Sequence, residues 1–340
     1  MTTPAERGFR LPAATTAHEC TAVGWPSLRR VDQWRGHLGA ARDAVAALAR
    51  ILAERERVLV VADEGEGRAA ESWVGEGIEV VELPTEEAWL RDTGPVVLLD
   101  DGGDRLAVDL GFNGWGGVAA QDGASAIAAA LASHLGLPAE TAPFVAEGGA
   151  FVADGRGRLL VTEPSVVTDD RNPGRSRDQL EADLRGWLGV DEVVWLVGGR
   201  HGDHTGSHAD DVVAFADEPG TVLLQTTTAT GDPDHATAEA NRVRLEEAGL
   251  AVVEIDVLPH VECFDVIVEV PYLNIHVGST AIYVPIAGAA ADRDIVAQIG
   301  EHFPGREAVP VPAAVLAYGG GGVRDVTLPV PAGTAPTAAG

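Results

Sequence analysis

The chain contains no lysine: all 24 of its basic residues are arginine. Without a lysine amine there is no Schiff-base chemistry, and the phosphate-binding loops that depend on lysine are excluded. Cysteine is nearly as scarce, with only Cys20 and Cys263. Two cysteines at this spacing match no zinc motif and build no disulfide framework. We therefore interpret both as small buried hydrophobic residues.

Long apolar runs are also missing. No stretch approaches the about eighteen apolar residues that a membrane helix needs, and the N-terminal segment MTTPAERGFR has no apolar signal core. We therefore expect a cytoplasmic protein without a membrane partner. A hydrophobic content of 46% is nevertheless enough for a buried core, which excludes a disordered chain.

Positive charge is outweighed by negative charge. The 52 acidic residues give a formal net charge of -28. Such a surface repels phosphates, so nucleic acid is excluded as a partner. It is compatible with a small cationic ligand, although an acidic surface most often serves solubility.

Helix and strand patterns alternate along the chain. Apolar residues recur at helical spacing over 38–52, and the run VLVVAD (58–63) is typical of a buried strand. Further helices bracketed by strands are expected at 122–136, 175–189, 234–249 and 290–303. Five such units suggest a repeated module, and no linker divides the chain, so we expect one α/β domain. A doubly wound nucleotide-binding sheet is disfavoured because no G-x-G-x-x-G follows the first strand.

Polar motifs fall at strand ends and in glycine-rich turns, where α/β proteins place their chemistry. In AWLRDTGP (88–95), the turn after Asp92 is expected to hold the carboxylate at the end of a strand. In EGGA (147–150), two glycines after Glu147 allow close approach of backbone or ligand. Taken alone each motif is weak, because an aspartate that caps a turn explains the first equally well.

Two later segments carry further polar groups. Asn274 interrupts an otherwise apolar strand in VPYLNIHVGSTAIYVP (270–285), and a buried amide needs partners. The glycine run in YGGGGVRDVT (318–327) is expected to bring Arg324 and Asp325 to one place.

The segment HGDHTGSHADD (201–211) is rich in histidine. Its glycines and hydroxyl residues disfavour a regular helix, so a metal site built from His201, His204 and His208 is not expected. His208 can instead act as a general acid/base with Asp210 beside it. A polar loop with solvated histidines is an equally good interpretation of this segment alone.

Together, and in this order, the motifs resemble the agmatine deiminase family and its bacterial peptidylarginine deiminase relatives. GFNGWGG (111–117), TEPSVVTDDRNPG (162–174) and FPGREAVPV (303–311) extend the resemblance over about residues 9–328. It implies a pentein fold, an α/β propeller of five ββαβ-type modules around a central pocket. We expect a flexible N-terminus at 1–8, a single domain at 9–328 and a disordered tail at 329–340.

The resemblance also implies an activity. The family replaces one guanidinium nitrogen of agmatine by water, giving N-carbamoylputrescine and ammonia without metal or organic cofactor. A cysteine attacks the guanidinium carbon, a histidine moves protons, and carboxylates hold the planar cation. Carried over by position, His208 is the acid/base and Asp92 and Asp210 are guanidinium clamps. Substrate contacts are expected from Asp92, Glu147, Asp210, Asn274, Arg324 and Trp89. A homo-oligomer is compatible with the resemblance.

The resemblance breaks at the nucleophile. Asp325 occupies the position of the family's cysteine, and Arg324 replaces the histidine before it. Ser207 stands where the family has glycine, Ala150 where it has serine, and Thr15 where it has tryptophan. A carboxylate is a weaker nucleophile than a thiolate and leaves readily, so the covalent thiol route is closed. A further carboxylate in the pocket should also raise at least one pKa unless a cation is bound.

Three outcomes stay open. In the first, Asp325 is a general base that directs water at a bound guanidine or amidine, and the chain is a divergent hydrolase. In the second, the pocket binds a guanidinium or amine ligand without turnover. In the third, Cys20 or Cys263 substitutes as nucleophile. The retained set favours the first outcome: Asp92, Glu147, His208, Asp210 and Asn274.

Overall fold

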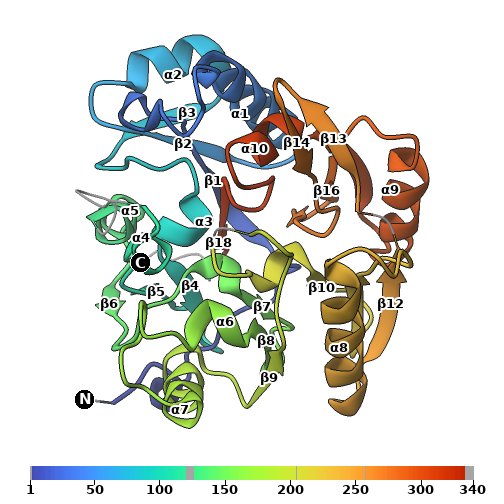
Figure 1. Cartoon of the computed structure of the whole chain (residues 1–340). Coiled ribbons are helices and arrows are strands. Elements are labelled where there is room, and N and C mark those ends of the chain that lie inside the picture. The colour runs from blue at the N-terminus through green and yellow to red at the C-terminus, as the bar shows by residue number, and fades with distance from the viewer. Residues whose placement is uncertain (1, 120–125, 204, 257, 334–340) are drawn as a thin grey trace.

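The computed structural model describes residues 2–119, 126–203, 205–256 and 258–333. The described residues form six small sheets. One is a two-stranded hairpin, and the other five stand around a common centre, with the longer helices on the outside (Figure 1). Among the described residues, no helix combines the length and the apolar character that crossing a bilayer requires.

Four of the sheets repeat one pattern, an antiparallel pair followed by a parallel strand. The parallel strand is reached through a helix, as a crossover between parallel strands requires. The elements of these modules, in chain order, are β4 (Val96–Leu99), β5 (Arg105–Asp109), α5 (Ile127–His134) and β6 (Ala139–Thr141); β7 (Phe151–Ala153), β8 (Arg158–Thr162), α7 (Arg177–Leu188) and β9 (Glu192–Leu196); β10 (Val213–Phe215), β11 (Thr221–Gln225), α8 (Asp234–Glu247) and β12 (Ala251–Ile255); and β15 (His276–Val277), β16 (Ala281–Ile286), α9 (Asp292–Glu301) and β17 (Glu307–Pro312).

The remaining sheet joins the two ends of the chain. Its strands are ordered β18-β1-β2-β3, and it carries α1 (Leu38–Ala53) and α2 (Gly67–Val74). The strands are β1 (His18–Gly24), β2 (Val58–Ala62), β3 (Glu79–Glu82) and β18 (Thr327–Pro331). β18 pairs antiparallel with β1, from Val23 opposite Thr327 to His18 opposite Pro331. The last strand of the chain therefore closes the ring on the first.

The short elements connect these modules. They are η1 (Ala5–Arg7), η2 (Leu28–Arg30), α3 (Leu90–Thr93), α4 (Gly114–Gly117), η4 (Gly148–Ala150), α6 (Glu163–Val166), η5 (Ala209–Asp211), α10 (Ala314–Tyr318) and the hairpin of β13 (His260–Cys263) with β14 (Val266–Glu269).

The expected ends of the chain differ in part from the structure. One 3-10 turn, η1, lies within the segment 1–8, of which Met1 is outside the described residues. At the other end, β18 continues to Pro331, three residues beyond the expected domain boundary, because these residues pair with β1. Residues 334–340 of the expected tail lie outside the described residues.

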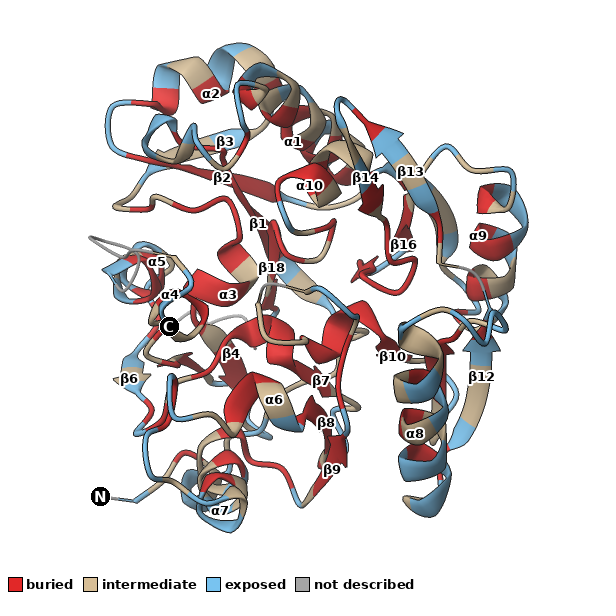
Figure 2. Cartoon of the chain, viewed as in Figure 1, coloured by how far each residue is buried: buried red, intermediate tan, exposed pale blue. Residues whose placement is uncertain are grey.

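The five expected helices are present and are observed as α1, α5, α7, α8 and α9. In α1 the residues at helical spacing, Ala41, Val45, Leu48 and Leu52, are fully buried, as a helix with one apolar face predicts. The expected helix at 122–136 is described from Ile127, and its residues 122–125 lie outside the described part. Figure 2 shows that burial concentrates on the inner strands and on the inward faces of the helices.

Candidate active site

The candidate residues lie shortly before the first strands of the five modules. The residues and the strands that follow them are Asp92 with β4, Glu147 with β7, His208 and Asp210 with β10, Asn274 with β15, and Asp325 with β18. These first strands are neighbours at the centre, where β4 contacts β18 and β7 contacts β10. A repeated position in the module therefore brings residues from distant parts of the sequence together.

Two local expectations are wrong. Asp92 does not end a strand but lies in the one-turn helix α3, in which the Gly94 amide donates to the Leu90 carbonyl. Asn274 does not lie within a strand but in the loop before β15. Pro271 in this loop has no N–H for a ladder, and the Asn274 amide closes a turn onto its carbonyl instead.

A cavity of about 180 Å³ lies on one side of this centre. Four of the expected site residues line it, namely Trp89, Asp92, His208 and Asp325. Residues that the sequence did not single out line it too: Arg30, Gln33, Trp115, Asp203, Thr205 and Asp211, with the glycines at 319–321. The space suits a small ligand, and its walls combine carboxylates with two indole rings.

Asp210 and Arg324 lie elsewhere. They line a larger cavity of about 460 Å³, together with Arg91. The Arg324 Nε donates to Asp210 Oδ2 at 2.8 Å. The neighbours Arg324 and Asp325 thus face different cavities, although the glycine run was expected to bring them to one place. Glu147 and Asn274 line neither cavity and contact the lining residues from behind.

His208 is held between carboxylates. Its Nε2 is 3.2 Å from Glu147 Oε2, and its Nδ1 is 3.8 Å from Asp92 Oδ2. Burial disfavours the imidazolium, but Asp92 and Glu147 outweigh burial and raise the pKa of His208 well above its usual value. The carboxylate expected beside His208, Asp210, pairs with Arg324 instead. The two carboxylates therefore favour the protonated form of His208.

Glu147 is itself fixed by an arginine. The Arg171 Nε donates to both carboxylate oxygens of Glu147, at 2.9 and 3.0 Å, and both side chains are almost completely buried. This contact leaves Oε2 directed also at His208. Glu147 therefore connects a fixed cation to the imidazole and determines where the ring points.

Asp92 accepts two hydrogen bonds within the site. Trp115 Nε1 donates to Oδ2 at 2.9 Å, and the Gly149 amide donates to Oδ1 at 3.0 Å. Burial raises the pKa of Asp92, with Glu147 adding to the shift and His208 opposing it. A Cβ at Gly149 would stand 2.7 Å from His208 Nδ1 and 2.8 Å from Asp92 Oδ1. Only glycine lets these two groups approach each other here.

Asp325 is oriented by two donors. Asn274 Nδ2 donates to Oδ1 at 3.1 Å, and the Gly322 amide donates to Oδ2 at 2.6 Å. Burial raises the pKa of Asp325, and the nearby carboxylate of Asp92 raises it further. A Cβ at Gly321 would meet the Trp89 ring at 2.6 Å and Asp325 Oδ2 at 2.9 Å. The glycine run therefore lets the carboxylate lie close to the indole.

Asn274 uses its whole amide in this arrangement. Besides the bond to Asp325, Nδ2 donates to Asp211 Oδ1 at 3.0 Å, and Oδ1 accepts from the Arg324 amide at 2.8 Å. Asp211 also accepts from the Arg200 guanidinium at 2.9 and 3.0 Å. Burial raises the pKa of Asp211 to about 6 despite this arginine.

Trp115, Arg171, Asp203 and Asp211 lie within the motifs quoted above, but the sequence alone assigns them no role. Nothing in a single sequence separates Asp211 from its neighbour Asp210, and only the backbone turn shows which one reaches the small cavity. Trp115 adopts the left-handed region, with φ 56° and ψ 48°, an uncommon conformation for a bulky residue. Ser207, next to His208, has φ 74°, which explains why glycine suits this position.

Other predicted candidates lie away from the small cavity. His201 is exposed, and His204 is outside the described residues. Cys20 is fully buried in β1, and burial raises the pKa of its thiol to about 11. Cys263 is buried in β13. Neither cysteine lines the cavity, so neither is placed to replace the nucleophile.

Comparisons with known proteins identify the family and the fold. Residues 10–331 match the family model of the Porphyromonas-type peptidyl-arginine deiminases. The chain is 34% identical to agmatine deiminase from Pseudomonas aeruginosa (strain UCBPP-PA14) and 32% identical to that of Stutzerimonas stutzeri (strain A1501), with 97% of each chain covered. Agmatine deiminase of Enterococcus faecalis superposes with a TM-score of 0.92 at 26% identity, covering 98% of both chains. This likeness confirms the expected pentein fold.

Proposed function

The chain belongs to the Porphyromonas-type peptidyl-arginine deiminase family, and on this premise we propose that it hydrolyses the guanidinium group of a small cationic substrate. The names of its relatives make agmatine the first candidate, with N-carbamoylputrescine and ammonia as products. The observation that carries the proposal is the small cavity, which Asp92, His208, Asp211 and Asp325 line together, with the pKa of His208 raised by its carboxylate neighbours.

The cavity suits a guanidinium group because that group is planar and permanently charged. Carboxylate oxygens at its edge accept its N–H groups, and the Trp89 indole offers a face over which a cation is attracted. A bound cation also offsets the crowding of like charges that raises the pKa of Asp92 and of Asp325. Substrate binding therefore favours the ionised carboxylates that the reaction needs.

In the proposed reaction, Asp325 takes a proton from water, and the water oxygen forms a bond to the guanidinium carbon. The His208 imidazolium gives its proton to one nitrogen, the bond from that nitrogen to carbon breaks, and ammonia leaves. The proton of the new hydroxyl group returns to His208 and leaves a ureido group. The proton on Asp325 goes to ammonia, so the net products are the ureido compound and ammonium.

The other predicted residues act through these groups. Glu147 positions His208 and keeps it protonated, and Asn274 positions Asp325. The clamp role expected for Asp210 suits Asp211 better in this structure, because Asp211 lines the cavity whereas Asp210 pairs with Arg324. Asp211 is therefore our candidate for the second guanidinium clamp beside Asp92.

Ammonia release tests the proposal. Purified protein is assayed for ammonia and ureido product over agmatine, arginine and small amidines, and we expect both products in equal amounts. Asp325→Asn keeps the side-chain shape but removes the base, and it should lower kcat by about 10²–10⁴-fold. Asp178→Asn, at an exposed position in α7, is the matched control and should be as active as the wild type. Absence of product from every compound contradicts turnover.

A second function is favoured by the exchange of the family's His-Cys pair for Arg324 and Asp325. The protein would then bind a guanidinium or amine ligand without converting it. Calorimetry separates the two: micromolar binding of agmatine without product supports the second function. In either case Asp92→Asn should weaken binding strongly, and unchanged binding would refute the cavity as the ligand site.

A further inference from the structure

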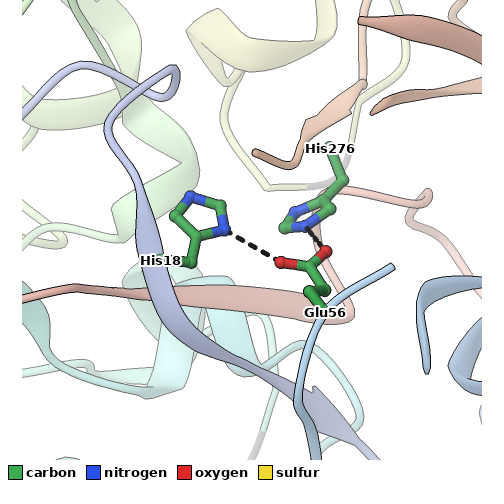
Figure 3. Close-up of side chains that lie close together, drawn as sticks. All are labelled: His18, Glu56 and His276. Atoms are coloured by element: carbon green, nitrogen blue, oxygen red, sulfur yellow. Dashed lines mark hydrogen bonds and ion pairs between the residues drawn. The ribbon is translucent and has the colours of Figure 1, made fainter. Parts of the chain in front are cut away.

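Three side chains outside the candidate active site bring metal-binding atoms together (Figure 3). His18 comes from β1, Glu56 from the turn before β2, and His276 from β15. His18 Nδ1 is 3.2 Å from Glu56 Oε2, and His276 Nε2 is 3.2 Å from Glu56 Oε1. The two rings lie beside each other, with centroids 5.6 Å apart, and each reaches one oxygen of the carboxylate. The Thr21 hydroxyl joins them, 3.0 Å from Glu56 Oε2 and 3.2 Å from His276 Nε2.

We propose that His18, Glu56 and His276 bind a divalent transition-metal ion, for which zinc is the best match. Two imidazole nitrogens and one carboxylate are a ligand set that zinc accepts, and three protein ligands leave a fourth position for water. A tetrahedral ion with bonds of about 2.0 Å has ligand atoms about 3.3 Å apart. The 3.2 Å separations already approach this spacing, and the three ligand atoms all lie within 4.8 Å of one another.

The charge balance of the cluster supports a cation. The three side chains are 3%, 7% and 1% exposed, in the order His18, Glu56 and His276. Within the described residues, no arginine lies within 4.0 Å of the Glu56 carboxylate, whose ion-pair partners are the two histidines. An ionised carboxylate that is buried without an arginine partner is costly. A divalent ion offsets it.

The position of the cluster would let an ion enter from solvent and link two modules of the fold. His18 lines the larger cavity, which offers a path to the site. His18 and Glu56 belong to the first module, whereas His276 belongs to the fifth. A metal would therefore connect two modules across their junction. His276 also follows the loop of Asn274, which orients Asp325, but none of the three ligands lines the small cavity.

Metal titration of the full chain tests the proposal. The protein is stripped with a chelator, and Zn²⁺ is then added in competition with a chromophoric chelator. We expect one zinc ion per chain with a Kd below micromolar and a thermal midpoint that rises with free zinc. Co²⁺ in its place should show the visible absorption of a four-coordinate ion. A stripped wild type that takes up no zinc overturns the proposal.

Single substitutions distinguish zinc bound at this site from zinc bound by surface carboxylates. Glu56→Gln should weaken zinc binding by at least about 100-fold and abolish the cobalt absorption, since one ligand of three is lost. His260→Gln is the matched control, because His260 forms an exposed pair with Glu269 at 3.0 Å without a second histidine, and its zinc affinity should equal that of the wild type.

If Glu56→Gln does not fold, as circular dichroism would show, His18→Gln replaces it with the same expected loss. Equal zinc affinity of the wild type and a folded ligand variant overturns the proposal. The triad is then a hydrogen-bonded structural cluster, and the zinc is held by surface carboxylates.

Discussion

At the residue scale, the two oxygens of Asp325 accept from Asn274 and from the Gly322 amide, and its carboxylate lies near that of Asp92. The resemblance to the deiminase family predicts that this position corresponds to the family's cysteine. On that prediction the chain retains the support of a nucleophile while presenting a weaker one.

Asp325→Cys should increase the rate of ammonia release from agmatine, because a thiolate attacks a guanidinium carbon directly. The imidazolium of His208 and the guanidinium cation should favour that thiolate. The measurement is initial rate against the wild type, and alkylation of the protein by iodoacetamide with and without agmatine confirms that the thiol lies in the cavity. A variant that binds agmatine but stays no faster than the wild type would show that Arg324 and the cavity walls have changed as well.

The charge state of His208 gives a prediction for pH. Because Asp92 and Glu147 raise its pKa in the folded chain, protonation of His208 stabilises the fold fully below about pH 6.5, and this contribution is lost as pH rises through the folded pKa. Glu147→Gln removes one of the two carboxylates and should lower the pKa of His208. NMR titration of the imidazole measures the shift, and an unchanged pKa would contradict the role of Glu147. Glu140→Gln, a change on the surface of β6, is the control.

Motif positions could be taken from the sequence, but side-chain directions could not. Trp89, Asp92, His208 and Asp325 do line one cavity, as the motifs indicated. Adjacent residues, however, can diverge: Arg324 and Asp325 face different cavities, and so do Asp210 and Asp211. The turns before β10 and β18 decide this, and a turn of irregular backbone leaves no periodic pattern to interpret.

At the element scale, patterns of neighbouring residues predicted the positions of helices and strands, because these depend on local sequence. The helical spacing of apolar residues in α1 and the continuous apolar run of β2 match the structure. The pairing of β1 with β18 joins residues that are more than 300 positions apart, for example Ala22 with Leu328. No local signal specifies such a contact, so the boundary placed at residue 328 cut the strand that closes the ring.

Leu328 tests how much that closing strand contributes. Its side chain is 2% exposed and packs in a cluster with Cys20, Leu59 and Leu90. Leu328→Ala should lower the free energy of unfolding by about 2–5 kcal/mol, because it leaves a cavity at the junction of the first and last strands. Urea unfolding measures the change. Leu28→Ala, at a side chain that is 60% exposed, should change it by less than about 0.5 kcal/mol. Equal effects of the two substitutions would contradict the role of β18.

At the scale of the whole molecule, the net charge of -28 acts on both stability and binding. Mutual repulsion opposes the compact state, and salt screens it, since the Debye length falls from about 30 Å at 0.01 M to about 10 Å at 0.1 M. Raising NaCl from about 0.01 to 0.1 M should therefore raise the thermal midpoint and slow the association of agmatine. Calorimetry and stopped-flow binding measure the two effects, and an uncharged amide of similar size serves as the control ligand. A midpoint that falls with salt would contradict self-repulsion.

The closed ring also determines at which stage of synthesis and folding the small cavity can form. Its wall takes Asp92, His208 and Asp325 from positions that precede β4, β10 and β18, and β18 is translated after the strands of the other modules. Until that strand docks on β1, a nascent chain offers no complete receptor for a cation. A cationic ligand can therefore bind a chain in which β18 is paired with β1. It finds no complete cavity on a chain that lacks this pairing.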